Sequence, residues 1–312
     1  MTAIDRKRVW IYLGFAFGIS WLTALVIHLT GGLQNSPVIE LDGSEVTLAY
    51  ILLATFYMFG PALANILTRR ITREGKANLL LEPKFDQGRW RFWLLAWFLP
   101  GLLTLLGAAV FFLLFPAYYD PKLGILTQQL EAAGSLTTAS PWLIVASQAL
   151  QALLLAPPLN AIPTFGEEFG WRGYLQPKLL PLGARKAALL TGLIWGIWHW
   201  PVILMGYNYG LDYFGAPFLG PLAMVWFTLA LAVIFGWLTI KAQSVWPAVI
   251  GHGTLNGIAA IGILLVRGEP STLLGPAPTG VIGGLAMALF AAALLFVPKG
   301  FNTRNKPAGP AA

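Results

Sequence analysis

The chain has 312 residues, of which 57% are hydrophobic and only 11% are charged. Soluble globular proteins carry about 25% charged residues, so this composition excludes a fully water-facing exterior and predicts an integral membrane protein. Cysteine is absent, which excludes disulfides, thiolate catalysis and cysteine metal sites. The net charge of +7 would suit a nucleic-acid partner, but the distribution of the basic residues, described below, argues against one.

Long apolar segments recur along the whole chain. A helix needs about 20 apolar residues to cross a bilayer, and eight segments approach that length: residues 9–29, 47–68, 91–115, 141–162, 187–206, 218–240, 245–266 and 279–297. The first is too long and continuous for a cleaved signal peptide, and we interpret it as a retained span. We therefore predict an all-α integral membrane protein, a bundle of about eight transmembrane helices in a single polytopic domain over residues 1–312. A short external helix is also expected at residues 122–133.

Basic residues predict the orientation. All of the 20 lysines and arginines except Lys122 and Arg267 fall in links on one side of this topology, at residues 6–8, 69–91, 172–186, 241 and 299–306. Because cytoplasmic loops carry the excess of Lys and Arg, we expect both termini to lie in the cytoplasm. The expected location of the protein is the plasma membrane of a prokaryote. The basic residues would face anionic lipid, so the expected partner is the lipid bilayer and not nucleic acid.

Residues 164–178 are the most unusual polar stretch. They place two adjacent carboxylates, Glu167 and Glu168, and the guanidinium of Arg172 at the end of an apolar run. An ionisable side chain at the centre of a membrane helix costs about 2.5–3.5 kcal/mol on insertion scales. Such groups are therefore paired, exposed to an internal cavity, or functional. Three prolines between residues 157 and 163 predict that the fourth span is broken and that a new helix begins near Thr164.

Two interpretations of this acidic pair stay open. On a helix Glu168 and Arg172 are four residues apart and can pair, while Glu167 is rotated by about 100° from its neighbour and can face a cavity. Alternatively, Thr164 and Glu167 form a capping box, in which Glu167 only closes a helix N-terminus.

Two further polar clusters lie inside predicted spans. In the fifth, Trp195 and His199 share a helix face, and Pro201 permits a kink after them. In the seventh, His252 and Asn256 are four apart and project into one site. The alternatives are a hydrogen-bonded packing role for His199 and interhelical hydrogen bonding by His252 and Asn256.

The glycines beside the third cluster predict a close helix contact. Gly253 and Gly257 have the small-xxx-small spacing that lets another helix approach closely. The predicted topology allows both histidines and the acidic pair to face one cavity in the inner half of the membrane, opening to the cytoplasm. A carboxylate, two imidazoles and an amide supply the base, the second water or metal partner and the oxyanion donors that hydrolysis needs.

These motifs, in this order on separate helices, resemble the CPBP family of intramembrane proteases, which includes the type II CAAX prenyl endopeptidases and bacteriocin-immunity proteins. The resemblance rests on Glu167-Glu168-Phe-Gly-Trp-Arg172, on Trp195 with His199, and on His252 with Asn256. It covers residues 140–265, the core region of the chain. Trp195 stands where the family often has Phe, and the aromatic side chain at this position is expected to serve packing.

The resemblance implies cleavage of peptide bonds in a membrane-associated protein or peptide. It gives Glu167 and His199 the task of holding and deprotonating a water, and Glu168 and Arg172 a supporting role. His252 and Asn256 would stabilise the oxyanion. A divalent metal such as Zn²⁺ held by Glu167, His199 and His252 is chemically reasonable, and so is a metal-free glutamate mechanism.

Two other classes of function stay open at this point. The first alternative is a non-catalytic membrane scaffold or immunity protein that uses the same fold to bind a partner. A proton-coupled transporter of small solutes would also use intramembrane carboxylates, although transporters often show inverted repeats and none is visible in this sequence.

Overall fold

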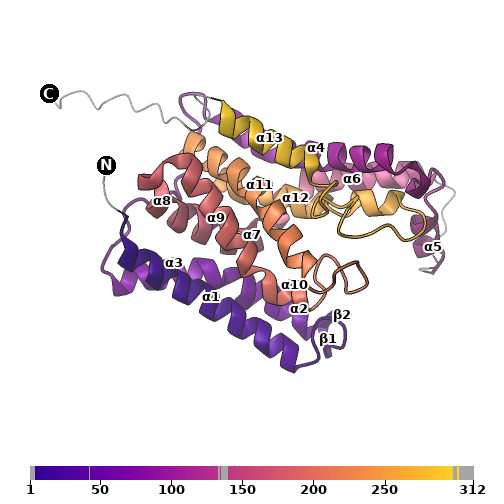
Figure 1. Ribbon diagram of the computed structural model, residues 1–312, viewed down its shortest axis with the longest axis horizontal. Helices are drawn as coiled ribbons and strands as arrows, with labels where there is room; N and C mark the ends of the chain where they lie inside the picture. Colours follow the sequence, from indigo (N-terminus) through magenta and orange to yellow (C-terminus); the bar gives the residue numbers. More distant parts are fainter. Residues whose placement is uncertain (1–3, 42, 133, 135–139, 298–300, 302–312) are drawn as a thin grey trace.

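The computed structural model describes residues 4–41, 43–132, 134, 140–297 and 301. Most helices run along the long axis of the molecule, and a β-hairpin lies at the end opposite to the start of the first helix (Figure 1). The elements of the described residues, in chain order, are α1 (Arg6–Leu29), β1 (Val38–Leu41), β2 (Ser44–Thr47), α2 (Leu48–Leu52), the π-helical turn η1 (Leu53–Tyr57), α3 (Met58–Ile71), α4 (Trp90–Leu114), η2 (Pro116–Tyr118), α5 (Gly124–Ala132), α6 (Pro141–Leu159), α7 (Ala161–Gly170), the π-helical turn η3 (Trp171–Leu175), α8 (Gln176–Leu179), η4 (Leu180–Leu182), α9 (Ala184–Trp198), α10 (Trp200–Leu204), α11 (Leu219–Ala242), α12 (Trp246–Ile258), η5 (Ile261–Leu265) and α13 (Leu285–Phe296).

Six helical stretches within the described residues are long and apolar enough to cross a membrane. They are Arg6–Leu29, Leu48–Ile71, Trp90–Leu114, Pro141–Leu159, Leu219–Ala242 and Trp246–Leu265, and each coincides with a predicted span. The segment predicted at 187–206 is divided into α9 and α10 at His199, and α13 covers only part of 279–297. A helical membrane protein is thus confirmed, while the number of eight crossings stays a prediction. The external helix expected at 122–133 is α5, and its last predicted residue, Ala133, lies outside the described residues.

Glycines set the closest contacts in the bundle. A Cβ added to Gly192 on α9 would lie 2.8 Å from the Cα of Leu229 and 2.8 Å from the Cβ of Ala232 on α11. At Gly253 on α12 it would lie 2.9 Å from the carbonyl oxygen of Pro157, and at Gly257 it would collide with a side chain of α6. The close approach predicted from the Gly253–Gly257 spacing is therefore confirmed, and its partner is α6.

The segment from α6 to α8 differs from the expected helix start. The break lies at Asn160, one residue before α7, and not at Thr164. Thr164 sits inside α7, where its Oγ1 donates to the carbonyl oxygens of Asn160 at 2.8 Å and Val249 at 3.1 Å. The capping-box interpretation of Glu167 is therefore wrong, because its hydroxyl partner is occupied elsewhere. The prediction that prolines break the fourth span is confirmed by the end of α6 at Leu159.

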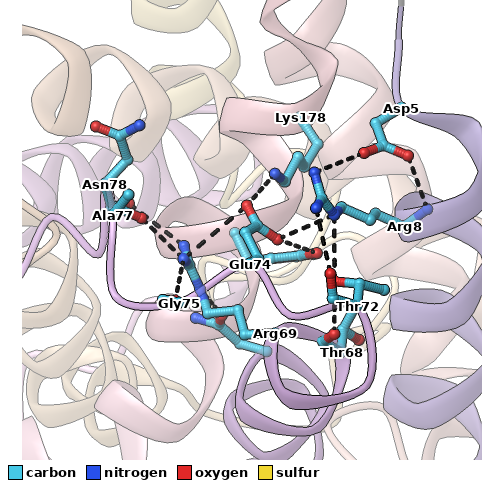
Figure 2. A network of polar contacts seen from close by, with 12 residues as sticks. Asp5, Arg8, Thr68, Arg69, Thr72, Glu74, Gly75, Ala77, Asn78 and Lys178 are labelled. Atoms are coloured by element: carbon cyan, nitrogen blue, oxygen red, sulfur yellow. Dashed lines mark hydrogen bonds and ion pairs between the residues drawn. The ribbon is translucent and has the colours of Figure 1, made fainter.

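Arg8, Arg69 and Lys178 lie together at the end of the bundle where α1 begins. There Glu74, after α3, accepts hydrogen bonds from Lys178 and from the hydroxyl of Tyr174 at 3.0 Å, and ion pairs with Arg8 at 3.6 Å and Arg69 at 3.9 Å (Figure 2). Burial acts to raise the pKa of the Glu74 carboxyl. The hydrogen bonds from Lys178 and Tyr174, together with the charges of Lys178 and Arg69, outweigh it and hold the pKa below its usual range. This network joins α1, α3 and α8.

The two ends of the described chain share this side of the bundle: α1 begins there and α13 ends there (Figure 1). An even number of crossings would produce this arrangement, and the orientation of the termini in the membrane stays a prediction. Three basic residues of that prediction, Lys299, Arg304 and Lys306, lie outside the described residues.

Candidate active site

Glu167 lies on α7 with its carboxylate inside the bundle. The side chain is only 3% exposed, and its Oε2 accepts a hydrogen bond from the indole Nε1 of Trp195 on α9 at 2.7 Å. Its Oε1 accepts no hydrogen bond from the described residues. One oxygen is therefore fixed by the protein, and the other remains available to a water or a substrate.

Glu168 faces away from Glu167 into a buried ion cluster, as the helix geometry predicts. Its Oε1 lies 2.9 Å from Nη1 of Arg172 and 2.9 Å from Nδ1 of His252. Glu168 and Arg172 are both 0% exposed. The predicted pairing of Glu168 with Arg172 is confirmed. The bond to His252 connects α7 to α12, so the acidic motif and the HxxxN motif share one buried carboxylate.

His199 occupies the single-residue break between α9 and α10. Its Nδ1 lies 2.8 Å from the carbonyl oxygen of Trp195. A carbonyl oxygen can only accept, so Nδ1 carries the proton and Nε2 of the neutral ring keeps its lone pair. The break that Pro201 was expected to permit begins one residue after Trp198, and it gives this ring its position.

All four predicted catalytic residues, Glu167, His199, His252 and Asn256, line one cavity of about 120 Å³. That volume exceeds what a single buried water requires, which is about 10–15 Å³ on the same measure. Most of the remaining wall is aromatic or aliphatic: Leu53, Tyr57, Met58, Trp195, Trp198, Val202, Tyr207, Met224, Phe227, Leu231 and Leu255. Glu168 and Arg172 lie outside the lining, behind the cavity wall.

Loop residues also contribute to the cavity wall. The lining includes Tyr207 and Asn208 after α10, and Pro278 and Thr279 before α13, and these loops lie at the end of the bundle opposite to the start of α1 (Figure 1). The predicted opening of the site toward the cytoplasm stays a prediction.

The expected metal ligands, Glu167, His199 and His252, do not lie as one compact group. Within the part of the chain that the structure describes, no group of three or more His, Cys, Asp or Glu side chains lies close enough to hold a metal ion. Glu167, His199 and His252 share the cavity. Each histidine bonds through Nδ1, to Glu168 or to the backbone, which leaves Nε2 as the ring nitrogen that could bind a metal. In their present positions the three side chains do not form a ligand group, and metal binding stays a prediction.

Two cavity residues were not foreseen as site residues. Trp195 was expected only to pack, yet its N–H bonds to Glu167. Tyr57, in the π-helical turn η1, lines the cavity and donates its hydroxyl to the carbonyl oxygen of Trp198, next to His199. The presence of Trp195 where the family often has Phe could have indicated a site role, since an indole adds a hydrogen-bond donor. No feature of the sequence near Tyr57 indicated that this residue lines the site.

Fold and site together define a helical membrane protein with a buried Glu–His–Asn cavity. Residues 148–258 match the model of a family described as type II CAAX prenyl endopeptidase Rce1-like. A curated protein, CAAX prenyl protease 2 of Methanococcus maripaludis, is 32% identical over 92 residues, which cover 29% of this chain and 34% of that protein. The chain thus matches about a third of the length of this relative. The resemblance predicted from the three motifs is confirmed for the core region that carries the site.

Proposed function

We propose that this chain is a membrane-embedded endopeptidase in which Glu167 activates a water for attack on a peptide bond. The observation that carries the proposal is the convergence of Glu167, His199, His252 and Asn256 on one cavity. The similarity of residues 148–258 to CAAX prenyl endopeptidases supports it. The apolar and aromatic wall suits a neutral, apolar stretch of a membrane-associated peptide or protein.

The first step is proton removal from water. Oε1 of Glu167 takes a proton while Nε2 of His199, which has a free lone pair, accepts a hydrogen bond from the same water. The hydroxide oxygen forms a bond with the carbonyl carbon of the substrate, and the carbonyl π electrons move to its oxygen. When that intermediate collapses, the C–N bond breaks and the proton on Glu167 passes to the leaving nitrogen.

The developing oxyanion needs hydrogen-bond donors. The side-chain amide of Asn256 can donate to it directly. His252 can donate through Nε2 when its ring carries both protons, because Nδ1–H is already held by Glu168. Arg172 pairs with Glu168 and so holds this buried carboxylate in place behind the cavity wall.

Glu167→Gln is the test of the catalytic role. Because a general base contributes about 10²–10⁴-fold to rate, we expect the purified variant in proteoliposomes to cleave a membrane-associated peptide library at least about 100-fold more slowly than the parent. Glu82→Gln, at an exposed carboxylate whose side chain is 76% exposed, is the matched control and should cleave at the parental rate. Equal rates for Glu167→Gln and the parent would rule out this mechanism. Substrate binding by the parent without cleavage would point to a partner-binding scaffold.

We also propose eight crossings with both termini in the cytoplasm of a prokaryotic cell. The basic end of the bundle supports this orientation. Because the parent has no cysteine, single cysteines report topology cleanly. Asp212→Cys and Ser271→Cys should react with a membrane-impermeant maleimide on intact cells, whereas Lys76→Cys should react only after permeabilisation. The opposite labelling pattern would show that the orientation is the reverse of the proposed one. A mixed labelling pattern would show that the number of crossings is not eight.

A further inference from the structure

Trp195 touches both halves of the polar site. Its Nε1 donates to Oε2 of Glu167 at 2.7 Å, and its ring lies 4.4 Å from the guanidinium carbon of Arg172. The edge of the same ring packs against His252, with ring centroids 5.5 Å apart. The side chain is 1% exposed, so these contacts form away from bulk water, where hydrogen bonds and cation–π attraction are strengthened.

The indole N–H has a specific consequence for Glu167. A glutamate carboxylate on a helix can rotate about three bonds, and this one reaches a cavity large enough for several orientations. Indole is a donor only, so it fixes Oε2 at one place and leaves Oε1 as the oxygen that can bind water. Effective general-base catalysis needs the base within about 2.6–3.2 Å of its proton. Fixing Oε2 therefore also fixes the position of the reacting oxygen.

We propose that Trp195 is a positioning residue for the catalytic carboxylate, and that its indole N–H, rather than its bulk, sets the rate of the reaction. The inference rests on the proposed function of Glu167 and adds a residue to it. A phenylalanine at this position would retain an aromatic face toward Arg172 but would leave Oε2 of Glu167 without its donor.

Neighbouring tryptophans show that the hydrogen bond is selective. The buried indole N–H groups of Trp198 and Trp200 have no hydrogen-bond partner within the described residues. Packing alone thus does not give an indole a partner in this part of the bundle. Trp200 does not line the cavity and provides the matched control for removal of an indole N–H.

Kinetics of Trp195→Phe and Trp200→Phe test the proposal. A hydrogen bond to a charged group contributes enough to predict a fall of about 10–100-fold in kcat for Trp195→Phe. Its KM should stay near that of the parent, because the substrate does not lose a contact. Trp200→Phe should keep the parental kcat and KM. A parental kcat for Trp195→Phe would overturn the proposal.

A second variant separates the N–H from the ring. Replacing Trp195 by 3-benzothienylalanine keeps the bicyclic shape and the face toward Arg172, and exchanges only N–H for sulfur. We expect the kcat of this variant to fall as far as that of Trp195→Phe. Full activity of the benzothienyl variant beside a slow Trp195→Phe would show that bulk is what matters, and would overturn the proposal.

An NMR measurement keeps this inference distinct from the proposed function. The Trp195 Nε1–H resonance, assigned by its loss in Trp195→Phe, should shift in Glu167→Gln, while the Trp200 resonance should not. An unchanged Trp195 resonance would show that the hydrogen bond to Glu167 is absent. The positioning role of Trp195 would then be wrong even if Glu167 is catalytic. A shifted resonance combined with parental cleavage by Glu167→Gln would instead overturn the catalytic assignment of Glu167, and the role of Trp195 in rate would fall with it.

Discussion

Replacing Arg172 by alanine should destabilise the protein far more than an ordinary arginine substitution. The guanidinium is fully buried, and it is the only positively charged group with a permanent charge that contacts Glu168 within the described residues. Removing one partner of a buried ion pair costs about 3–5 kcal/mol because the other charge stays buried. The loss of the contacts with the rings of Trp195 and Phe235, at 4.4 and 5.4 Å, acts in the same direction, whereas the retained hydrogen bond from His252 limits the total.

For a chain of this size each kcal/mol lowers Tm by roughly 2–4 °C, so Arg172→Ala should melt roughly 6–20 °C below the parent. Intrinsic fluorescence of the 13 tryptophans measures Tm in detergent without a label. Arg89→Ala is the control, because its partner Asp86 is 60% exposed and an exposed pair contributes only about 0–1 kcal/mol. The neutral double variant Glu168→Gln/Arg172→Gln should melt above Arg172→Gln. A Tm for Arg172→Ala equal to that of the parent would refute the reasoning.

Three further outcomes follow from other contacts. The folded-state pKa of Glu74 is depressed, so the stabilisation by this carboxylate is present above the unfolded pKa of about 4.3 and is lost as pH falls through the lower folded value. Acidification below about pH 5 should therefore lower the Tm of the parent more than the Tm of Glu74→Gln. Parallel pH profiles of the two proteins would contradict this. Gly192→Val should lower Tm by several degrees because an added Cβ would lie 2.8 Å from the Cα of Leu229, whereas Gly14→Val, at a position with open space, should not. Asn256→Ala should lower kcat by about 10²–10³-fold if its amide serves the oxyanion, and an unchanged kcat would remove it from the site.

The helices and the local pairs were predictable because they depend on neighbouring residues. Apolar length alone located the six long helices, and the four-residue spacing of Glu168 and Arg172 was enough to predict their ion pair. Membrane crossing by these helices is also predictable from composition, because a helix forms the hydrogen bonds of its backbone N–H and C=O groups within its own segment.

Contacts between helices could not be predicted in this way. His252 bonds to Glu168 rather than facing only the cavity, and this depends on how α12 is rotated against α7. The bond from Trp195 to Glu167 depends on the rotamer of one indole. The capping-box interpretation was wrong because the hydroxyl of Thr164 donates to a carbonyl oxygen on α12.

The cavity wall has two origins in the chain. Glu167, His199 and His252 belong to the region that matches the endopeptidase family. Leu53, Tyr57 and Met58, from η1 and the start of α3, lie outside that region yet line the same space. Tyr57 also bonds to the backbone beside His199, so only changes at Leu53 and Met58 would alter which peptide fits without disturbing the residues proposed to cut it. The reaction would then remain common to distant relatives while the choice of substrate diverges, and exchanging Leu53 and Met58 between relatives, with Tyr57 kept, would be a direct way to transfer that choice.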